Sequence, residues 1–512
     1  MARKSINKWQ FGDFQTPDAL AEEVVSVLKD RHSIEPDVII EPTCGKGAFV
    51  RAALQNFKES TVIGADINSE YVQQAKASTA NYPNSSNAVI QQLDFFNTDW
   101  HSIVSKQSGY ILVIGNPPWV TSSELSALNS NNFPSKSNFQ RRRGIDAITG
   151  SGNFDISEWM LLQHVDWLRK KEGAIALLCK YSVARKVIRQ VECRDRGSFS
   201  SYIYLVDAKA HFGASVEACL FILCSSEHST GCPVYSGLNA REPAQVIGER
   251  DGFVLSDTVK YEKWKHLLGK ELRYIWRSGI KHDCSKVMEL KKSGDLFENG
   301  FGRSYALEEN YLYPLLKSSD VGNSRVERCR KFALITQNFV GEDTTIIKDD
   351  APETWKYLQE YTELLENRKS SIYKNRPPYS VFGIGAYTFK PWKVAISGLY
   401  KRLNFQLVSP LHEKAVVFDD TVNFLSFDTE EEARFIFSLV ISEPSLALLD
   451  AMIFWDEKRP ITISILRRLS FKAIAKELGL LDTYLSWATM MQMSPNGQFE
   501  LGLAEKQSKY TV

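Results

Sequence analysis

The sequence DVIIEPTCGKGAFVRAALQNF at residues 37–57 contains an apolar run, a glycine-rich turn and a helical pattern in immediate succession. The run DVIIEP (37–42) has the length and apolar content of a buried strand. Gly45 and Gly47 follow it and allow the backbone to approach a ligand closely at the end of that strand. The apolar spacing of AFVRAALQNF (48–57) then predicts a helix, so the stretch predicts one strand–turn–helix unit.

Similar units follow along the first half of the chain. Further strands are expected at TVIGADI (61–67), VIQQLDFF (89–96), YILVIGNPP (110–118), AIALLCK (174–180), YIYLVDA (202–208) and ACLFILC (218–224). Helical spacing separates several of them, and a helix is also expected to begin earlier, with Thr16 as N-cap and Pro17 as its first residue. This alternation predicts an α/β fold with a Rossmann-like, mostly parallel sheet between layers of helices. The last two strands lie close enough in sequence to give one antiparallel edge strand.

The character of the sequence changes near residue 232. Beyond it, the strand–helix alternation gives way to segments rich in Tyr, Trp, Gly and basic residues, such as RPPYSVFGIGAYTF (376–389). A chain of 512 residues is long enough for about two to four domains. We therefore predict two domains, at residues 1–232 and 233–512.

The composition excludes several classes of protein. The chain has 62 Lys+Arg against 61 Asp+Glu, a net charge of +1, so any attraction to DNA must come from local patches of charge. No apolar run approaches the roughly 18 residues that span a bilayer, and the N-terminus lacks the apolar core of a signal peptide, which predicts a cytoplasmic protein. The eight Cys and eight His form no C-x-x-C or H-E-x-x-H pattern, so we expect reduced thiols and no metal site.

Acidic residues at strand ends accompany the glycine-rich turn. Asp66 ends the second predicted strand, where nucleotide-binding units place a carboxylate on ribose hydroxyls. The fingerprint G-x-G-x-x-G is absent after Gly47, which disfavours NAD and favours a ligand with one ribose and no phosphate, such as S-adenosylmethionine. Asp94 is placed to accept a hydrogen bond from an adenine amino group, with Phe95 beside it to pack on the ring. Turn glycines and strand-end carboxylates also occur without a ligand, so the pattern alone leaves both interpretations open.

The segment Asn116-Pro117-Pro118-Trp119 directly follows an apolar strand. The two prolines end the strand in a rigid, extended conformation. This conformation can hold the Asn116 side-chain oxygen and the Pro117 carbonyl toward one point, where they accept both hydrogens of a planar amino group. Such acceptors would favour a pyramidal nitrogen whose lone pair faces an electrophilic methyl group, and Trp119 would offer a stacking surface. A structural turn with a buried Trp is the alternative interpretation.

Together these motifs resemble the gamma-class (Taq-type) S-adenosylmethionine-dependent adenine-N6 DNA methyltransferases of bacterial restriction-modification systems. The motifs that carry the resemblance, in order, are FQTP (14–17), EPTCGKGAF (41–49), GADI (64–67), LDFF (93–96), GNPPW (115–119), NFDISEWM (153–160), GAIALLCK (173–180) and HFGASVEACLFIL (211–223). The resemblance implies a class I methyltransferase sheet in the first domain and an α+β target-recognition domain in the second. It also implies S-adenosylmethionine as cofactor, double-stranded DNA as substrate and a cognate restriction endonuclease as functional partner. We expect a monomer.

The resemblance implies roles for individual residues. Those expected to bind the cofactor are Thr16, Pro17, Glu41, Thr43, Gly45, Gly47, Asp66, Asp94, Phe95 and Asn116. Those expected at the target base are Asn116, Pro117, Pro118, Trp119 and Phe212. Trp119 and Phe212 would pack on the two sides of a target base flipped out of the duplex. Trp119 stands where Tyr is commoner in the family.

Two groups of basic residues are candidates for contacts with DNA. The Ser- and Asn-rich stretch 120–152 contains Lys136, Arg141, Arg142 and Arg143. A loop of this length is usually functional or disordered, and a solvated basic surface is as consistent with the pattern as DNA contact. In the second domain, the residues expected to face phosphates, with an ordinary surface as the alternative, are Arg376, Lys390, Lys393, Lys401 and Arg402.

Other functions are consistent with parts of this pattern. A cytosine-N4 DNA methyltransferase performs the same chemistry, although Ser in place of Asn116 would favour it. A protein glutamine-N5 methyltransferase also uses Asn-Pro-Pro-Tyr, but its glycine-rich turn usually begins with Asp and it has no comparable C-terminal half. A DNA-binding protein with a decayed methyltransferase fold is disfavoured because every catalytic position is present.

Overall fold

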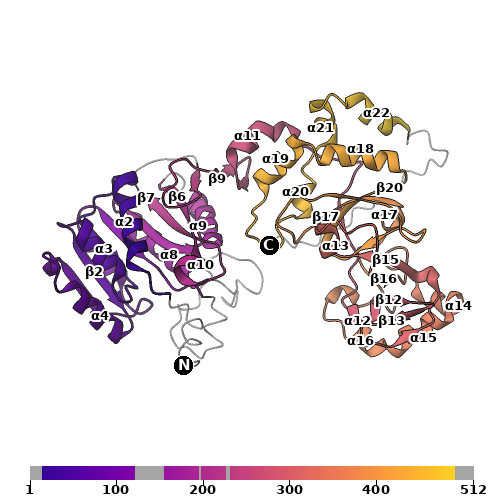
Figure 1. Cartoon of the computed structure of the whole chain (residues 1–512), viewed down its shortest axis with the longest axis horizontal. Coiled ribbons are helices and arrows are strands. Elements are labelled where there is room, and N and C mark those ends of the chain that lie inside the picture. Colours follow the sequence, from indigo (N-terminus) through magenta and orange to yellow (C-terminus); the bar gives the residue numbers. More distant parts are fainter. Residues whose placement is uncertain (1–13, 121–154, 195–197, 226–230, 491–512) are drawn as a thin grey trace. The chain divides into compact units, whose positions relative to one another are not determined.

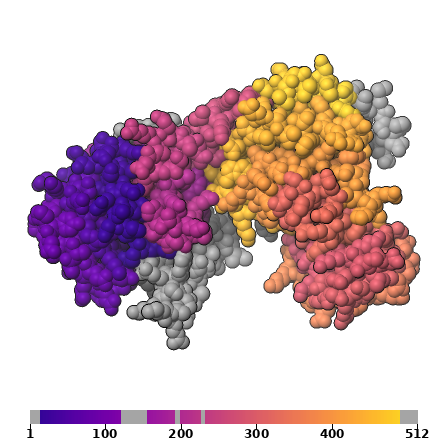
Figure 2. Space-filling view, in the orientation of Figure 1, coloured from indigo at the N-terminus to yellow at the C-terminus, as the bar shows by residue number. Residues whose placement is uncertain are grey.

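The computed structural model divides the chain into two compact units, Met1–Val259 and Lys260–Val512. The residues that it describes are 14–120, 155–194, 198–225 and 231–490. Figure 1 draws the first unit in indigo to magenta and the second in magenta to yellow. Figure 2 shows the surface of the protein in the same orientation and with the same colours along the sequence.

The first unit is built around one ten-stranded sheet with the order β10-β9-β8-β6-β7-β5-β4-β1-β2-β3. The strands are β1 Val38–Glu41, β2 Thr61–Asp66, β3 Ala88–Gln92, β4 Ile111–Gly115, β5 Gly173–Lys180, β6 Ser200–Val206, β7 Ala218–Cys224, β8 Cys232–Tyr235, β9 Gln245–Arg250 and β10 Phe253–Leu255. The strands β1 to β5 are parallel to one another. The prediction of a mostly parallel, Rossmann-like sheet is therefore confirmed.

The antiparallel strand β7 lies inside the sheet. It pairs with β5 on one side and with β6 on the other. Beyond β6 the sheet continues through the parallel strand β8 and then through β9 and β10, each antiparallel to its predecessor. These additional strands follow residue 232, so the first unit extends to Val259 rather than to the boundary that the sequence predicted. The extra strands are short and have no helices between them, which is why the strand–helix pattern did not reveal them.

Helices cover both faces of this sheet (Figure 1). They are α2 Asp18–His32, α3 Ala48–Asn56, α4 Ser69–Thr79, the 3₁₀ turn η1 Ser85–Asn87, α5 Trp100–Ser105, α8 Ile156–Leu168, α9 Tyr181–Arg194 and α10 Ala208–Phe212. Alternate residues of β4 and β5 pack with α2 and α3 in one apolar core, whereas α8 and α9 contact β5 outside that core. This arrangement brings the loops after the parallel strands to one edge of the sheet.

Helix α2 begins one residue later than the sequence predicted. Pro17 occupies the N-cap position in an extended conformation, and its carbonyl accepts the first helical hydrogen bond, from Ala21. Thr16 does not cap the helix. Its hydroxyl instead accepts a hydrogen bond from Asn116, so a residue expected to begin a helix contributes to a site.

The second unit is an α+β structure with two sheets. The four-stranded sheet has the order β11-β20-β17-β18, and the six-stranded sheet has the order β14-β13-β12-β16-β15-β19. Their strands are β11 Arg277–Ser278, β12 Glu289–Ser293, β13 Leu296–Glu298, β14 Ser304–Tyr305, β15 Leu312–Leu316, β16 Lys331–Leu334, β17 Trp392–Ser397, β18 Gln406–Val408, β19 Val417–Phe418 and β20 Val422–Phe427. All the pairings are antiparallel except β15 with β19.

Short helices connect and cover these strands. They are α11 Thr258–Trp264, η2 Lys265–Leu267, α12 Ser285–Met288, η3 Glu309–Tyr311, α13 Ser318–Gly322, η4 Thr344–Ile346, α14 Ile347–Asp350, α15 Pro352–Glu360, α16 Thr362–Glu366, η5 Ser371–Tyr373, α17 Ala386–Phe389, α18 Glu430–Val440, α19 Glu443–Met452, α20 Ile463–Leu466, α21 Phe471–Glu477 and α22 Leu481–Met490. Within the described part of the chain, no single helix has the length and apolar character needed to cross a membrane. Only α18 and α19 taken together, bent by 60°, meet that test.

Candidate functional site

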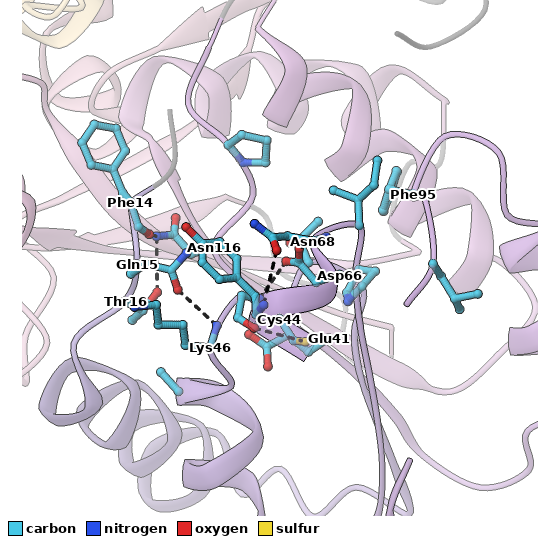
Figure 3. Close-up of a pocket in the computed structure, with 18 of the residues that line it drawn as sticks. Phe14, Gln15, Thr16, Glu41, Cys44, Lys46, Asp66, Asn68, Phe95 and Asn116 are labelled. Atoms are coloured by element: carbon cyan, nitrogen blue, oxygen red, sulfur yellow. Dashed lines mark hydrogen bonds between the residues drawn. The ribbon is translucent and has the colours of Figure 1, made fainter. Parts of the chain in front are cut away.

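The loops that follow β1, β2, β3 and β4 line a cavity of about 740 Å³ in the first unit (Figure 3). The residues singled out in the sequence that line it are Thr16, Pro17, Glu41, Thr43, Gly45, Asp66, Phe95, Asn116 and Pro118. Those that do not line it are Gly47, Asp94, Pro117, Trp119 and Phe212. The structure therefore brings most of the predicted pocket together from segments that are far apart in sequence.

The carboxylate of Asp66 holds the glycine-rich turn against the end of β2 (Figure 3). One of its oxygens accepts from the Gly45 backbone N–H at 2.8 Å, and the other accepts from the Asn68 N–H at 2.8 Å. Gly45 and Gly47 both have left-handed backbone conformations, with φ of +50° and +81°. A Cβ on Gly47 would also lie 3.0 Å from the Cβ of Ala75 in α4, so glycine is required there by conformation and by space.

The N-terminal segment 14–17 connects the glycine-rich turn to Asn116. The Gln15 side-chain oxygen accepts from the Lys46 backbone N–H at 3.1 Å. The Asn116 side-chain amide donates to the Phe14 carbonyl at 3.0 Å and to the Thr16 hydroxyl at 3.3 Å. The segment thus contacts both sides of the cavity, as Figure 3 shows.

These contacts determine which way the Asn116 amide faces. The Phe14 carbonyl can only accept a hydrogen bond, so the nitrogen of the amide must point toward it. The Asn116 oxygen is left buried, and it has no hydrogen-bond partner in the described structure. A buried acceptor without a partner costs about 1–3 kcal/mol, and a ligand that donates to this oxygen would recover that cost.

Glu41 supplies a second unpartnered acceptor in the same cavity. It ends β1, is 3% exposed, and its Oε2 atom has no hydrogen-bond partner among the described residues. Burial, with a smaller contribution from the nearby carboxylate of Asp66, raises the pKa of Glu41 well above its ordinary 4.5. The cavity therefore offers a carboxyl group that a cationic ligand would keep ionised.

The aromatic residues expected at the target base are packed against one another. Trp119 is 5% exposed, and its indole N–H donates to the Leu178 carbonyl at 3.3 Å. Its ring centroid lies 5.2 Å from that of Phe212 at an interplanar angle of 75°, and 5.4 Å from that of Phe14. No base fits between Trp119 and Phe212 in this arrangement, so stacking on both would require the rings to separate.

The neighbouring residues Asp94 and Phe95 have different environments in the structure. β3 ends at Gln92, and the Asp94 carboxylate accepts from the Phe96 backbone N–H at 2.9 Å and from the Asn97 amide at 2.5 Å. Asp94 therefore organises the turn after β3, while Phe95 beside it lines the cavity. Asp94 is not among the residues that line the cavity in this arrangement.

The cavity is also lined by residues to which the sequence analysis gave no role, among them Gln15, Asn68, Tyr71 and Met160. Met160 lies in the quoted motif NFDISEWM, and two of the others also carried a signal in the sequence. Gln15 lies inside the FQTP motif, and Asn68 is the N-cap of α4, where its side chain accepts from the Glu70 backbone N–H at 2.9 Å.

A buried histidine lies behind the Phe95 wall of the cavity. His164 in α8 is 1% exposed, and its ring centroid is 4.5 Å from that of Trp167 and 5.6 Å from that of Phe95. Neither ring nitrogen has a hydrogen-bond partner in the described structure. Burial lowers the pKa of His164 from 6.5 to about 3, so the imidazole is neutral in the folded protein.

Replacing His164 with Leu is expected to raise the free energy of unfolding at pH 7 by about 1 kcal/mol, because it removes buried polar nitrogens that have no partner. Below pH 6.5 the unfolded chain takes up a proton at this position and the folded protein does not. This group therefore lowers the stability of the wild type by up to about 1.4 kcal/mol per pH unit as the pH falls from 6.5 toward 3. Urea unfolding at pH 5.5 and 7.5 measures both effects.

The control is His101→Leu, at an exposed position in α5. That change should leave the pH dependence of unfolding as it is in the wild type. Equal pH dependence in wild type and His164→Leu would contradict the assignment. His32, whose pKa is lowered to about 4 by burial and by Arg31, retains its own contribution in all three proteins.

The basic residues proposed for DNA contact have different outcomes. Lys136, Arg141, Arg142 and Arg143 lie outside the described residues. Lys393 is fully buried in β17 and donates to the Lys390 carbonyl at 2.7 Å, so the prediction that it faces a phosphate is wrong. Burial lowers its pKa to about 7. Lys390 itself pairs with Asp428 at 2.8 Å, Arg402 donates to the Gly322 carbonyl, and Arg376 is exposed.

Comparison with known proteins places this site in a family. No family model matches the chain. Type II methyltransferase M.NspV from Nostoc sp. is 42% identical over 473 residues, which cover 92% of this chain and 98% of that protein. Type II methyltransferase M.CvrRI from Paramecium bursaria Chlorella virus XZ-6E is 30% identical over 110 residues, covering 22% of this chain and 25% of that protein.

A solved structure, the type IIL restriction-modification enzyme MmeI in complex with DNA, resembles the fold with a TM-score of 0.50 and 12% identity. The match covers 93% of this chain and 68% of that one. The cavity of the first unit suits a methyltransferase cofactor, since Glu41 and Asn116 present unpartnered acceptors beside a glycine-rich turn. S-adenosylmethionine is the cofactor. The identity to M.NspV over nearly its whole length shows that the chain belongs to the type II methyltransferase family.

Proposed function

We propose that this type II methyltransferase transfers a methyl group to the N6 amino group of adenine within a short sequence of double-stranded DNA. The modification would protect that sequence from a cognate restriction endonuclease. One observation carries the proposal, namely the buried and unpartnered side-chain oxygen of Asn116 at the wall of the cavity. A planar amino group that donates to this oxygen would satisfy it.

The chain's own residues perform the positioning in this proposal. Phe14 and Thr16 hold the Asn116 amide so that its oxygen is left without a partner among the described residues. The second acceptor in this proposal is the Pro117 carbonyl of the same rigid segment, although Pro117 does not line the cavity in this arrangement. Two acceptors on the protons of the amino group leave its lone pair available on one side. When bound, S-adenosylmethionine supplies an electrophilic methyl group. No charged general base is required of the protein in this step.

Entry of the base requires a rearrangement of aromatic rings in the first unit. An adenine inside a duplex cannot reach the cavity and must be flipped out, at a cost of a few kcal/mol. Phe14, Trp119 and Phe212 contact one another at centroid distances of 5.2 to 5.9 Å. We infer that Trp119 and Phe212 move apart when the base enters, and that the base then packs between them.

The target base is identified by one experiment. The protein is incubated with S-adenosylmethionine and bacterial genomic DNA amplified by PCR, which carries no methylation, and the nucleosides are analysed by mass spectrometry. We expect N6-methyladenine, and modification mapping would then give the recognition sequence. N4-methylcytosine in its place would overturn the assignment of the base, and unmodified DNA would overturn the proposal of a DNA substrate.

The raised pKa of Glu41 predicts a pH-dependent affinity for the cofactor. The neutral Glu41 carboxyl must lose its proton before it can attract a cation such as the ammonium group of S-adenosylmethionine. We therefore expect the dissociation constant for the cofactor to fall as the pH rises above 4.5 through the raised pKa of Glu41. Isothermal titration calorimetry between pH 5 and 8 measures this dependence.

The matched variant is Glu41→Gln, which keeps the shape of the side chain and cannot ionise. It should bind the cofactor more weakly at pH 8, and its affinity should change little with pH. An affinity that changes with pH as in the wild type would show that another group is responsible. Glu35→Gln, at an exposed position just before β1, provides the control for the loss of a carboxylate.

A further inference from the structure

Phe339 is unusually exposed for an aromatic residue in a well-ordered turn of the second unit. Its exposed fraction of 57% is the largest of any Phe in the part of the chain that the structure describes. The turn around it is stiffened by buried Gln337, whose amide donates to the Phe339 carbonyl at 2.9 Å and whose oxygen accepts from the Val381 N–H at 3.3 Å. The Glu342 carboxylate accepts from the Asn338 backbone N–H and amide. These hydrogen bonds restrain the turn, so the ring of Phe339 stays exposed to solvent.

A second segment, 374–382, is fastened to this turn. Thr336 donates to the Tyr379 carbonyl at 3.0 Å, and Thr344 donates to the Pro378 carbonyl at 2.6 Å. A guanidinium nitrogen of Arg376 lies 3.9 Å from the position that a Cβ on Gly341 would occupy. Arg376 is therefore adjacent to the turn that carries Phe339, and the two segments form one surface, which we call the 339/376 surface.

The backbone of the second segment is held in an unfavourable conformation. Asn375 and Tyr379 have φ of +58° and +60°, and a bulky residue such as Tyr rarely adopts this region. Tyr379 is nonetheless 7% exposed and its hydroxyl lies 2.8 Å from that of Thr362, so packing enforces the conformation. Strain of this kind persists where the surrounding structure maintains a particular geometry, and it occurs often at functional sites.

Two cations of this surface have no ion-pair partner in the part of the chain that the structure describes. Lys374 and Arg376 are exposed, and neither forms an ion pair within the described residues. Some exposed cations of the unit are paired, as in Arg303 with Glu360 at 2.6 Å and Arg330 with Asp320 at 2.6 Å, whereas Lys348 and Lys472 are exposed without an ion pair among the described residues. Of the nearby carboxylates, Glu342 accepts from Asn338, and Asp343 accepts from the Thr345 N–H at 2.9 Å. Both carboxylates keep their negative charge, but neither forms an ion pair with Lys374 or Arg376, so the two cations can contact an anionic partner.

We propose that the 339/376 surface contacts double-stranded DNA. Unpaired cations on a segment that is hydrogen-bonded to the turn with an exposed aromatic ring are complementary to a polyanion that also offers sugars and base edges. Lys374 and Arg376 neutralise phosphates, and Phe339 packs against the sugar and base edges of a groove. The proposal rests on the proposed function, because it assumes that DNA is the substrate.

The test measures binding of a fluorescently labelled DNA duplex at several salt concentrations, together with the methylation rate on PCR-amplified genomic DNA. We expect the double variant Lys374→Ala/Arg376→Ala to bind about tenfold more weakly. Its salt dependence, log K against log salt, should be shallower by up to about 0.9 for each lost phosphate contact. Phe339→Ala should lower the methylation rate on this DNA about tenfold at sub-saturating concentration, with the salt slope unchanged, because it removes an uncharged contact.

Two control variants remove an exposed ring and an exposed cation at other positions. Phe253→Ala removes a 39% exposed ring from β10 in the first unit, and Arg303→Ala removes a cation that is already paired. Both should bind and methylate DNA as the wild type does. Thermal unfolding and cofactor binding are measured for every variant, so that a folding defect is not mistaken for a lost contact.

The outcomes separate this inference from the proposed function. If the wild type methylates DNA and all the variants match it in affinity, rate and salt slope, the 339/376 surface does not contact DNA and the proposed function stands. If the wild type does not methylate DNA, the proposed function fails and this inference fails with it. If only the test variants are impaired while they still bind the cofactor, both are supported.

Discussion

Replacing Asn116 with Ala is expected to lower the methylation rate about a thousandfold while the affinity for S-adenosylmethionine changes little. The side chain holds its oxygen as an unpartnered acceptor at the cavity, and no other side chain of the Asn-Pro-Pro-Trp segment offers an acceptor. Its loss removes an interaction that is strongest when the amino group becomes pyramidal. Single-turnover methylation rates and calorimetry with the cofactor measure the two quantities separately.

Two further variants test the orientation of the Asn116 amide. Asn116→Asp keeps the shape but sets a carboxylate oxygen against the Phe14 carbonyl, and we expect it to lose nearly as much activity as Asn116→Ala. Thr16→Val removes only the weaker of the two contacts, at 3.3 Å, and we expect a loss of about tenfold or less. The control is Asn97→Ala, an exposed amide bound to Asp94, which should be fully active. More than a tenth of the wild-type rate in Asn116→Ala would rule out the assigned role.

Replacing Glu289 with Ala is expected to destabilise the second unit by about 3 kcal/mol. This carboxylate is 3% exposed and accepts from Lys317 at 2.7 Å and from Lys331 at 2.7 Å. Its loss leaves two ammonium groups facing each other without their counter-ion, which in buried networks costs about 3–5 kcal/mol. The lower end applies because Lys317 and Lys331 are 34% and 35% exposed and reach water. Calorimetric unfolding should show the effect in the transition of this unit.

The pH dependence of Glu289 follows from the same contacts. Burial alone would raise the pKa of this carboxyl, but hydrogen bonds from His282, Lys317 and Lys331 outweigh it and hold the pKa well below the ordinary 4.5. Its contribution to stability is therefore fully present above pH 4.5 and is lost as the pH falls below that value. Glu353→Ala removes an exposed carboxylate paired with Lys356 and should cost less than about 1 kcal/mol. A similar cost for Glu289→Ala would mean that the network is not stabilising.

The first half of the fold could be predicted well because its signals are local. The run at 37–42 became β1, the helical spacing at 48–57 became α3, and Gly45 and Gly47 adopt the left-handed conformations that a tight turn after a strand requires. The prediction that the antiparallel strand lies at the edge of the sheet was wrong, because β7 lies between β5 and β6. Its position depends on β8, β9 and β10, and pairing between strands is decided by contacts that no short stretch of sequence contains.

Side-chain environments were harder to predict than the elements that carry them. Trp119 appeared free to stack on a base, yet its indole N–H contacts Leu178 and its ring contacts Phe14, each far away in sequence. Lys393 appeared to be a surface cation between apolar neighbours. However, its strand β17 lies between β18 and β20, and the Lys393 side chain is buried. Burial depends on which elements pack together, and a residue type alone does not reveal that.

The strands β1 to β7 of the first unit, the glycine-rich turn and the rigid Asn-Pro-Pro segment could be predicted from the sequence. Each of these depends on backbone preferences over a few neighbouring residues. Only the tertiary structure decided the direction of the Asn116 amide, because its partners Phe14 and Thr16 lie 102 and 100 residues away. Likewise, only folding placed the carboxylate of Asp66 on the Gly45 backbone. Hydrogen bonds between distant segments form only after those segments have packed. Residue types could therefore indicate the chemistry of the site, but the geometry of the site depends on packing.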